Sequence, residues 1–183
     1  MACGVGYGAK LLAEAGHRVV AVDRSDEAID YACEHYAHER VQYVCAEAGA
    51  EAIGGANFDA VVCLETLEHL EDPQPLLQEF CRAAPILIAS VPNEDQFPHR
   101  GMIAFHHRHY RPHEFKALIE GAGFVIRSWY GQEGGESELE PDLMGRTIMV
   151  IAERGEPDAV VAAPVVPSHR KPDGPKRVVL VGL

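Results

Sequence analysis

Two carboxylates and an imidazole stand close together in the middle of the chain, in the segment Glu65-Thr-Leu-Glu68-His69. If Glu65 begins a helical turn, side chains at positions i, i+3 and i+4 share one face. Such a set can bind a hard divalent cation, or His69 can take a proton from an acceptor hydroxyl while the acids orient it. The alternative is that Glu68 and His69 only cap and solvate the start of a helix.

Histidines cluster again between Asn93 and Arg111, a polar and aromatic stretch without a clean period. His106 and His109 could ligate a metal, but no cysteine or acid stands at the spacing of a closed zinc site. We favour a loop whose imidazoles and aromatic rings cover a substrate over a plain solvated loop. The candidate bases are therefore His69, His106 and His109, in that order.

The chain begins with a glycine-rich stretch that contains Gly4, Gly6 and Gly8. Glycine has no Cβ, so it can take a positive φ and let a ligand approach the backbone closely. Residues 10–16 are predicted to form a short helix that ends at a glycine. A glycine turn that leads into a helix directs N–H groups and the positive end of the helix dipole at a bound ligand.

Asp23 closes the predicted strand 17–23, and an acid at that place can accept both hydroxyls of a ribose. Glycine turn, helix, strand and acid together describe half of a nucleotide-binding α/β domain. The spacing Gly4-x-Gly6-x-x-Ala9 also fits the dinucleotide fingerprint. On this loop alone, a nicotinamide dehydrogenase remains an alternative to other nucleotide-binding enzymes.

The elements that must position these groups alternate between apolar strands and amphipathic helices. The strand 58–64 is nearly all apolar, which is typical of a strand covered by helices on both faces. The other predicted strands are 41–45, 84–91, 123–126 and 147–153, and the helices are 27–38, one from about 73, and 112–121. The first of these helices is predicted to place Ile29, Cys33 and Tyr36 along one face.

Composition narrows the classes of partner. The formal net charge of −12 argues against a sequence-independent grip on nucleic acid or an anionic membrane, because both need clustered Lys and Arg. No apolar run reaches the ~18 residues of a membrane-spanning helix. The 5 cysteines stand singly, which suits reduced, buried thiols and predicts a cytoplasmic protein. A small-molecule substrate agrees with this composition, and assembly into a homodimer is left open.

A family resemblance rests on these motifs. Ala-Cys-Gly-x-Gly-x-Gly at residues 2–8, followed by Val-Val-Ala-Val-Asp at 19–23, resembles the first two motifs of class I S-adenosylmethionine-dependent methyltransferases. Residues 65–73 resemble the matching stretch of ubiquinone-type O-methyltransferases. The resemblance covers residues 2–153 and implies an α/β fold with a Rossmann-like doubly wound sheet, mostly parallel with an antiparallel last strand. It disfavours a dehydrogenase, which has no reason to carry Glu-x-x-Glu-His after its fourth strand.

The resemblance implies an enzyme that uses S-adenosylmethionine to methylate a small-molecule acceptor. A hydroxyl oxygen is favoured, because the Asn/Asp-Pro-Pro-Tyr/Phe signature of amino-group methylation is absent. The glycines would meet the methionine end of the cofactor, Asp23 the ribose, and Glu47 the adenine amino group. The cofactor-binding set is then Cys3, Gly4, Gly6, Gly8, Asp23, Arg24, Glu47, Ala48 and Leu64. The catalytic candidates are His69, Glu65, Glu68, His106 and His109.

A divalent metal is associated with the Glu-x-x-Glu-His set in the ubiquinone-type group. We do not favour a metal at Glu65, Glu68 and His69 in this chain. The alternative function is a non-catalytic or truncated methyltransferase-like module that serves as a binding or fusion partner.

That alternative arises from the first residues. In this family the glycine loop leaves the end of the first, central strand, and here Met1 stands in that place. We therefore expect a methyltransferase domain at 1–154 with a truncated first central strand, a linker at 155–176, and the start of a further element or domain at 177–183. The predicted strand 177–181 could fill the central gap. We favour instead N-terminal residues that this chain does not carry, because 178–183 resemble the opening of an unrelated domain.

Overall fold

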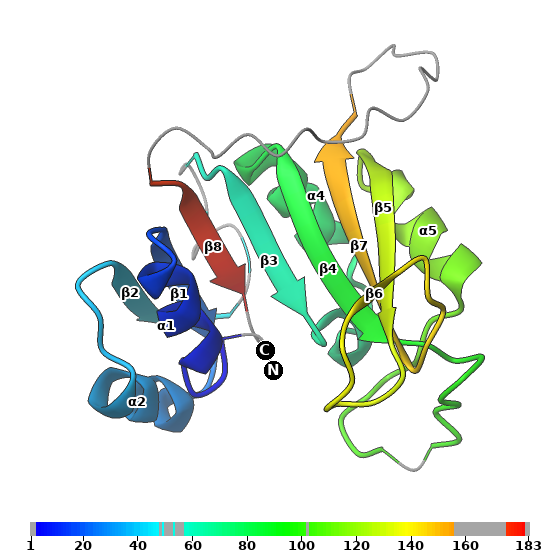
Figure 1. Ribbon diagram of the computed structural model, residues 1–183, viewed down its shortest axis with the longest axis horizontal. Coiled ribbons are helices and arrows are strands. Elements are labelled where there is room, and N and C mark those ends of the chain that lie inside the picture. Colours follow the sequence, from blue (N-terminus) through cyan, green and yellow to red (C-terminus); the bar gives the residue numbers. More distant parts are fainter. Residues whose placement is uncertain are drawn as a thin grey trace.

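The computed structural model describes residues 3–47, 49, 53, 57–101, 103–155 and 175–181. It contains one eight-stranded sheet with the strand order β2-β1-β8-β3-β4-β7-β5-β6 (Figure 1). The strands are β1 (Arg18–Asp23), β2 (Val41–Cys45), β3 (Ala60–Leu64), β4 (Ile86–Pro92), β5 (Phe124–Gln132), β6 (Glu140–Pro141), β7 (Thr147–Arg154) and β8 (Arg177–Val181). The helices are α1 (Tyr7–Glu14), α2 (Asp26–His35), the 3-10 turn η1 (Leu67–His69), α4 (Gln74–Ala83) and α5 (Pro112–Gly121).

The sheet is parallel on one side and antiparallel on the other. β2, β1, β8, β3 and β4 pair in parallel, whereas β7 pairs antiparallel with both β4 and β5. The predicted doubly wound α/β sheet with antiparallel strands after its parallel part is therefore confirmed. The carboxyl ends of the parallel strands all meet at the edge from which the long loop 93–111 extends (Figure 1).

The centre of the sheet differs from our preferred expectation. β8 lies between β1 and β3, with Val19 paired to Val178 on one side and Val61 paired to Val179 on the other (Figure 1). Our preference for 178–183 as the opening of an unrelated domain was wrong in this respect. The physical reason is that a central gap would leave two rows of backbone N–H and C=O groups unpaired, and β8 satisfies both rows. The predicted linker at 155–176 falls mostly outside the described residues.

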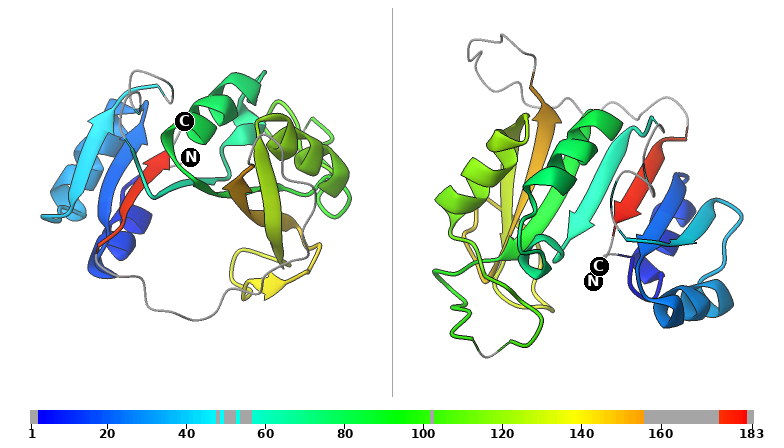
Figure 2. Two further views of the ribbon diagram at one scale, coloured as in Figure 1. Left: turned by 90° about the horizontal axis from the view of Figure 1, so that it is seen from above. Right: turned by 180° about the vertical axis from the view of Figure 1, so that it is seen from behind.

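Two apolar clusters cover the two faces of the sheet. Helices α4 and α5 contribute Leu77, Phe80 and Phe115 to one cluster, and α1 contributes Ala9 and Ala13 to the other. Figure 2 shows α1 on one side of the sheet and α4 and α5 on the other. In β8, Val179 belongs to the first cluster and Val178 and Leu180 to the second, so this strand is packed on both faces.

Helix α2 is shorter than the predicted helix 27–38 and is capped at its start. Ser25 caps it by accepting a hydrogen bond from Ala28 N at 3.2 Å. The buried residues of α2 are Ile29 and Ala32, whereas Cys33 is exposed. The expectation of buried thiols was therefore wrong for Cys33, which is exposed on α2, and for Cys45, the last residue of the edge strand β2.

No helix in the described part of the chain is both long enough and apolar enough to cross a lipid bilayer.

Candidate functional site

The glycine loop is fastened to the end of β1 by Asp23. This carboxylate is 2% exposed, and its Oδ2 accepts a hydrogen bond from Gly4 N at 2.9 Å. Its Oδ1 accepts from Ser25 N at 3.0 Å, at the start of α2. The two oxygens of Asp23 therefore bind the backbone of the glycine loop and the backbone at the start of α2. The role of Asp23 as a ribose acceptor stays a prediction, and the sequence could not show these two bonds.

The three glycines of the loop have different surroundings. Gly4 and Gly6 have positive φ values of 49° and 91°, so both take the left-handed conformation that favours glycine. A Cβ on Gly6 would lie 2.6 Å from Ala32 Cβ and 2.7 Å from the Tyr43 hydroxyl. A Cβ on Gly8, inside α1, would meet only Leu180 Cδ2 at 3.8 Å. Only the first two positions depend on the special conformation of glycine.

The other predicted cofactor-binding residues surround this loop to different degrees. Cys3 is buried, and burial, with Asp23 as the next cause, raises the pKa of its thiol to about 12. Arg24 and Glu47 are exposed just beyond the carboxyl ends of β1 and β2. Leu64 is half-buried at the end of β3. Ala48 lies outside the described residues.

The turn after β3 departs from the predicted helix. Glu65 has a φ of 48°, a conformation that costs a non-glycine residue about 1–3 kcal/mol. Ser90 Oγ donates to Glu65 Oε1 at 2.8 Å, and Glu65 N donates to Ser90 O at 3.1 Å. The expectation that Glu65 shares a helical face with Glu68 and His69 was wrong, because the left-handed turn directs Glu65 toward β4.

Glu68 is the most isolated carboxyl group of the cluster. Its side chain is fully buried, and neither carboxyl oxygen has a hydrogen-bond partner among the described residues. Burial, with the neighbouring Glu65 as the second cause, raises the pKa of the Glu68 carboxyl to about 8. Among the described residues, the basic atom that pairs with Glu68 is His69 Nε2, at 3.9 Å from Glu68 Oε1, which is too far for a hydrogen bond.

The structure brings three predicted histidines together beside Glu68. The rings of His69 and His106 lie edge to face with their centroids 4.5 Å apart. His106 Nδ1 lies 2.9 Å from His109 Nε2. His109 is buried, and its Nδ1 donates to Phe97 O at 2.6 Å. Burial lowers the pKa of the His69 and His106 imidazoles, that of His106 to about 4, so both rings are neutral near pH 7.

Residues that the sequence did not identify hold the histidine-bearing loop in place. Asn93 is buried at its start, and its Nδ2 donates to Gly145 O at 2.8 Å. Glu94 Oε2 accepts from His99 N at 2.9 Å, and His107 N donates to Glu68 O at 2.7 Å. The position of Asn93 after a strand was visible in the sequence, but its partner 52 residues away was not.

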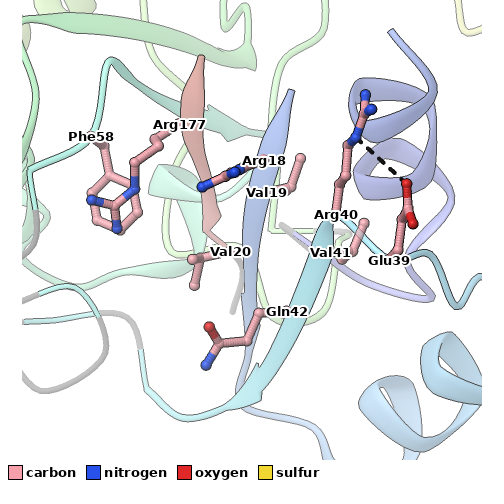
Figure 3. A pocket seen from close by; sticks show the side chains of 9 residues that line it. All are labelled: Arg18, Val19, Val20, Glu39, Arg40, Val41, Gln42, Phe58 and Arg177. Atoms are coloured by element: carbon pink, nitrogen blue, oxygen red, sulfur yellow. Dashed lines mark ion pairs between the residues drawn. The ribbon is translucent and has the colours of Figure 1, made fainter. Parts of the chain in front are cut away.

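A hollow at the opposite edge of the sheet is not part of this cluster. It has a volume of about 620 Å³ and lies where β1, β2 and β8 begin (Figure 3). Arg18, Arg40 and Arg177 line it, but Arg40 turns toward Glu39 and Arg177 lies over the Phe58 ring (Figure 3). Because these three guanidinium groups do not converge on one point, we place the candidate site at the carboxyl edge.

Comparison with known proteins agrees with this fold and this loop. Residues 1–84 match the family model described as a methyltransferase domain. Over 129 residues the chain is 33% identical to a probable S-adenosylmethionine-dependent methyltransferase of Mycobacterium tuberculosis, covering 67% of this chain and 46% of that protein. It is also 33% identical over 78 residues to the ubiquinone biosynthesis O-methyltransferase of Coxiella burnetii, covering 42% of this chain and 33% of that enzyme. The chain thus spans about half or less of these two relatives.

Solved structures share the fold. An S-adenosylmethionine-dependent methyltransferase from Clostridium acetobutylicum superposes with a TM-score of 0.66 at 11% identity, covering 84% of this chain and 82% of that one. A putative S-adenosylmethionine-dependent methyltransferase from Listeria monocytogenes gives 0.65 at 16% identity, covering 84% and 88%. The fold and the glycine loop define a class I methyltransferase domain. The chain belongs to the S-adenosylmethionine-dependent methyltransferases, and S-adenosylmethionine is the cofactor that this family implies.

Proposed function

We propose that this chain binds S-adenosylmethionine at the glycine loop and methylates the hydroxyl oxygen of a small-molecule acceptor. Family membership supports the methyl transfer. The similarity to an enzyme named ubiquinone biosynthesis O-methyltransferase supports oxygen as the acceptor atom. The observation that carries the proposal is the His69 imidazole, which is neutral and keeps one ring nitrogen free at the carboxyl edge of the sheet.

The residues of the loop fit the cofactor. Helix α1 begins at Tyr7 without a side-chain cap, so its first N–H groups are available to the methionine carboxylate. Gly4 and Gly6 have no side chain, so the cofactor can approach their backbone closely beside the start of α1. Asp23 holds the loop in shape and is the nearest carboxylate for the ribose, and the exposed Glu47 is available to the adenine amino group. We therefore keep these residues as the cofactor site.

The acceptor proton goes to His69 in this proposal. His69 Nδ1 lies 2.9 Å from Phe105 O, and since a carbonyl only accepts, Nδ1 carries the hydrogen and Nε2 keeps its lone pair. S-adenosylmethionine, when bound, would supply an electrophilic methyl group, and its sulfur would keep the electron pair of the broken bond and leave as the thioether of S-adenosylhomocysteine. His69 Nε2 receives the hydroxyl proton as the oxygen–methyl bond forms, and the imidazolium later releases it to water.

The histidine-bearing loop supplies the acceptor side. A cavity of about 740 Å³ lies against this loop and the start of α5, lined by His99, His107, Arg100 and Arg108 among others. His109 orients His106 and is itself enclosed, so we assign it a positioning role rather than that of a base. His69 does not line this cavity, so the proposal of a small acceptor rests on the family resemblance and on the composition of the loop. We also retain the proposal of a cytoplasmic protein, on the single cysteines.

The test combines binding and turnover on the full chain. Calorimetry with S-adenosylhomocysteine should show one site per chain, and radiolabelled methyl groups should pass to members of a panel of phenols and hydroxy acids but not to matched amines. His69→Ala should lower turnover far more than cofactor affinity. Binding without transfer to any hydroxyl compound would favour the non-catalytic module. Equal losses of affinity and turnover in His69→Ala would mean that His69 only supports the fold.

A further inference from the structure

We propose that Glu68, His69 and His106 form a site for a borderline transition-metal dication of the Zn²⁺ type. One ligand atom from each residue lies within 4.8 Å of the other two. Among the described residues, this is the one group of at least three potential ligands drawn so close together. It joins η1 to the loop 93–111, so its members come from segments that are distant in the sequence.

Hydrogen-bond partners assign the proton on each ring. His69 Nδ1 donates to Phe105 O, which leaves Nε2 as a bare acceptor. His109 Nδ1 donates to Phe97 O, which leaves His109 Nε2 to accept from His106 Nδ1. His106 then also keeps a bare Nε2. Both histidines are therefore in the tautomer that binds a metal through Nε2.

The third acceptor is Glu68, and the surroundings of its carboxyl group are a second observation that favours a cation. Its side chain is 0% exposed, yet neither oxygen meets a donor among the described residues. A buried carboxyl group without a partner is costly. Because His69 is 3.9 Å from Glu68, the pair is not bridged by a hydrogen bond. A dication between the three groups would satisfy all three lone pairs at once.

The donor set selects the kind of cation. Two imidazole nitrogens and one carboxylate suit Zn²⁺ and similar ions, whereas Mg²⁺ prefers oxygen ligands. Glu65, which the sequence grouped with Glu68 and His69, instead accepts a hydrogen bond from Ser90. The set in the structure therefore contains the His106 imidazole in the place that the family resemblance gives to the Glu65 carboxylate.

The surroundings of the two histidines have the pattern of a metal site. Metal-ligating histidines donate their other N–H to a carbonyl, carboxylate or similar acceptor, which fixes the ring. Phe105 O does this for His69, and the chain from His109 to Phe97 O does it for His106. Ligand atoms ~2.1 Å from one ion lie about 3.4 Å apart, so His69 and Glu68, now 3.9 Å apart, and the other separations of up to 4.8 Å must shorten when an ion binds.

A bound ion would tie the loop over the carboxyl edge to η1. It would also change the part that His69 takes in the proposed methyl transfer, since a ligating Nε2 cannot accept a proton. The ion would instead present a Lewis acid to the acceptor oxygen. Ion binding itself does not depend on the proposed function, because it can be measured without cofactor, acceptor or turnover.

The experiment titrates Co²⁺ into the full, chelator-treated chain without a histidine tag. We expect one Co²⁺ per chain with visible d–d absorption, displaced by one equivalent of Zn²⁺. His106→Ala and His106→Gln should each weaken Co²⁺ binding by more than tenfold, and His109→Ala by roughly 10–100-fold. Hydrogen exchange should slow at residues 103–107 when Zn²⁺ is added.

Two variants serve as matched controls. His107→Ala removes a neighbouring exposed imidazole, and Glu65→Gln removes the carboxylate of the family-implied set; both should bind Co²⁺ within about twofold of the parent chain. The proposal is overturned if the parent chain binds no Co²⁺, if His107→Ala loses as much as His106→Ala, or if Glu65→Gln loses binding while both His106 variants keep it. Thermal unfolding without metal confirms that each variant is folded. Methyl transfer can succeed or fail in any of these cases, so the two proposals are judged separately.

Discussion

Gly6 and Gly8 stand two residues apart in the same loop, but a methyl group would have opposite effects on them. In Gly6→Ala the new Cβ would overlap Ala32 and Tyr43, at a φ of 91°. We expect a loss of ~2 kcal/mol or more in the free energy of unfolding, from strain and overlap together. Gly8→Ala, with its nearest contact at 3.8 Å, should unfold within about 0.5 kcal/mol of the parent chain. Urea denaturation of both variants measures the difference, and equal losses would contradict this assignment.

Asp23 should contribute to folding as well as to cofactor binding. Asp23→Ala leaves the N–H groups of Gly4 and Ser25 without their acceptor, which costs about 1–3 kcal/mol in a buried site. We therefore expect a lower free energy of unfolding without ligand, together with weaker S-adenosylhomocysteine binding. Denaturation and calorimetry check the two parts. An Asp23→Ala chain of unchanged stability would show that the two hydrogen bonds do not fasten the loop.

The sequence identified most residue types of the site but not their partners. Asp23, Glu68 and His69 could be singled out because acids and histidines at strand ends are informative without a structure. The turn at Glu65 could not be predicted, since it depends on Ser90, 25 residues away. The carbonyls of Phe97 and Phe105 fix the histidine tautomers, and a backbone carbonyl leaves no signal in a sequence.

At the scale of elements, β8 decides whether the sheet holds together. It pairs with β1 and β3, and Val178, Val179 and Leu180 are all buried. Removal of residues 175–183 should therefore abolish cooperative unfolding, because two hydrogen-bond ladders and both apolar clusters lose a central member. A synthetic peptide of residues 175–183 should restore it in part. A shortened chain that unfolds as cooperatively as the parent would contradict the central place of β8.

Element types were predictable where periodicity was strong, as in α5, which runs from Pro112 to Gly121 as expected. The place of β8 was not predictable, because four consecutive apolar residues fit any central strand equally well. Only the unpaired edges of β1 and β3 select that place, and those edges exist only in the assembled sheet. The sequence also predicted a strand only at 123–126, whereas β5 continues to Gln132. The pairing of β5 with β7 extends it, with a register shift between Ile126 and Ser128.

At the scale of the whole molecule, thiol reactivity reports on the fold. Burial raises the pKa of Cys3 and Cys63 to about 12, so at pH 8 almost no thiolate forms at either residue in the folded chain. Cys33 is exposed and should react first with iodoacetamide. Between pH 7 and 9 labelling at Cys3 and Cys63 should stay negligible until urea unfolds the chain. Mass spectrometry of labelled peptides measures this, and early labelling of Cys63 would contradict the described core.

The central claim is that the carboxyl edge of the sheet, and not the arginine-lined hollow at its other end, binds the cofactor. Hydrogen exchange of the full chain with and without saturating S-adenosylhomocysteine tests it directly. We predict slower exchange at residues 3–9 and 23–25 and no change at 39–42, which border the hollow in Figure 3. Slower exchange at 39–42 with an unchanged glycine loop would contradict the account.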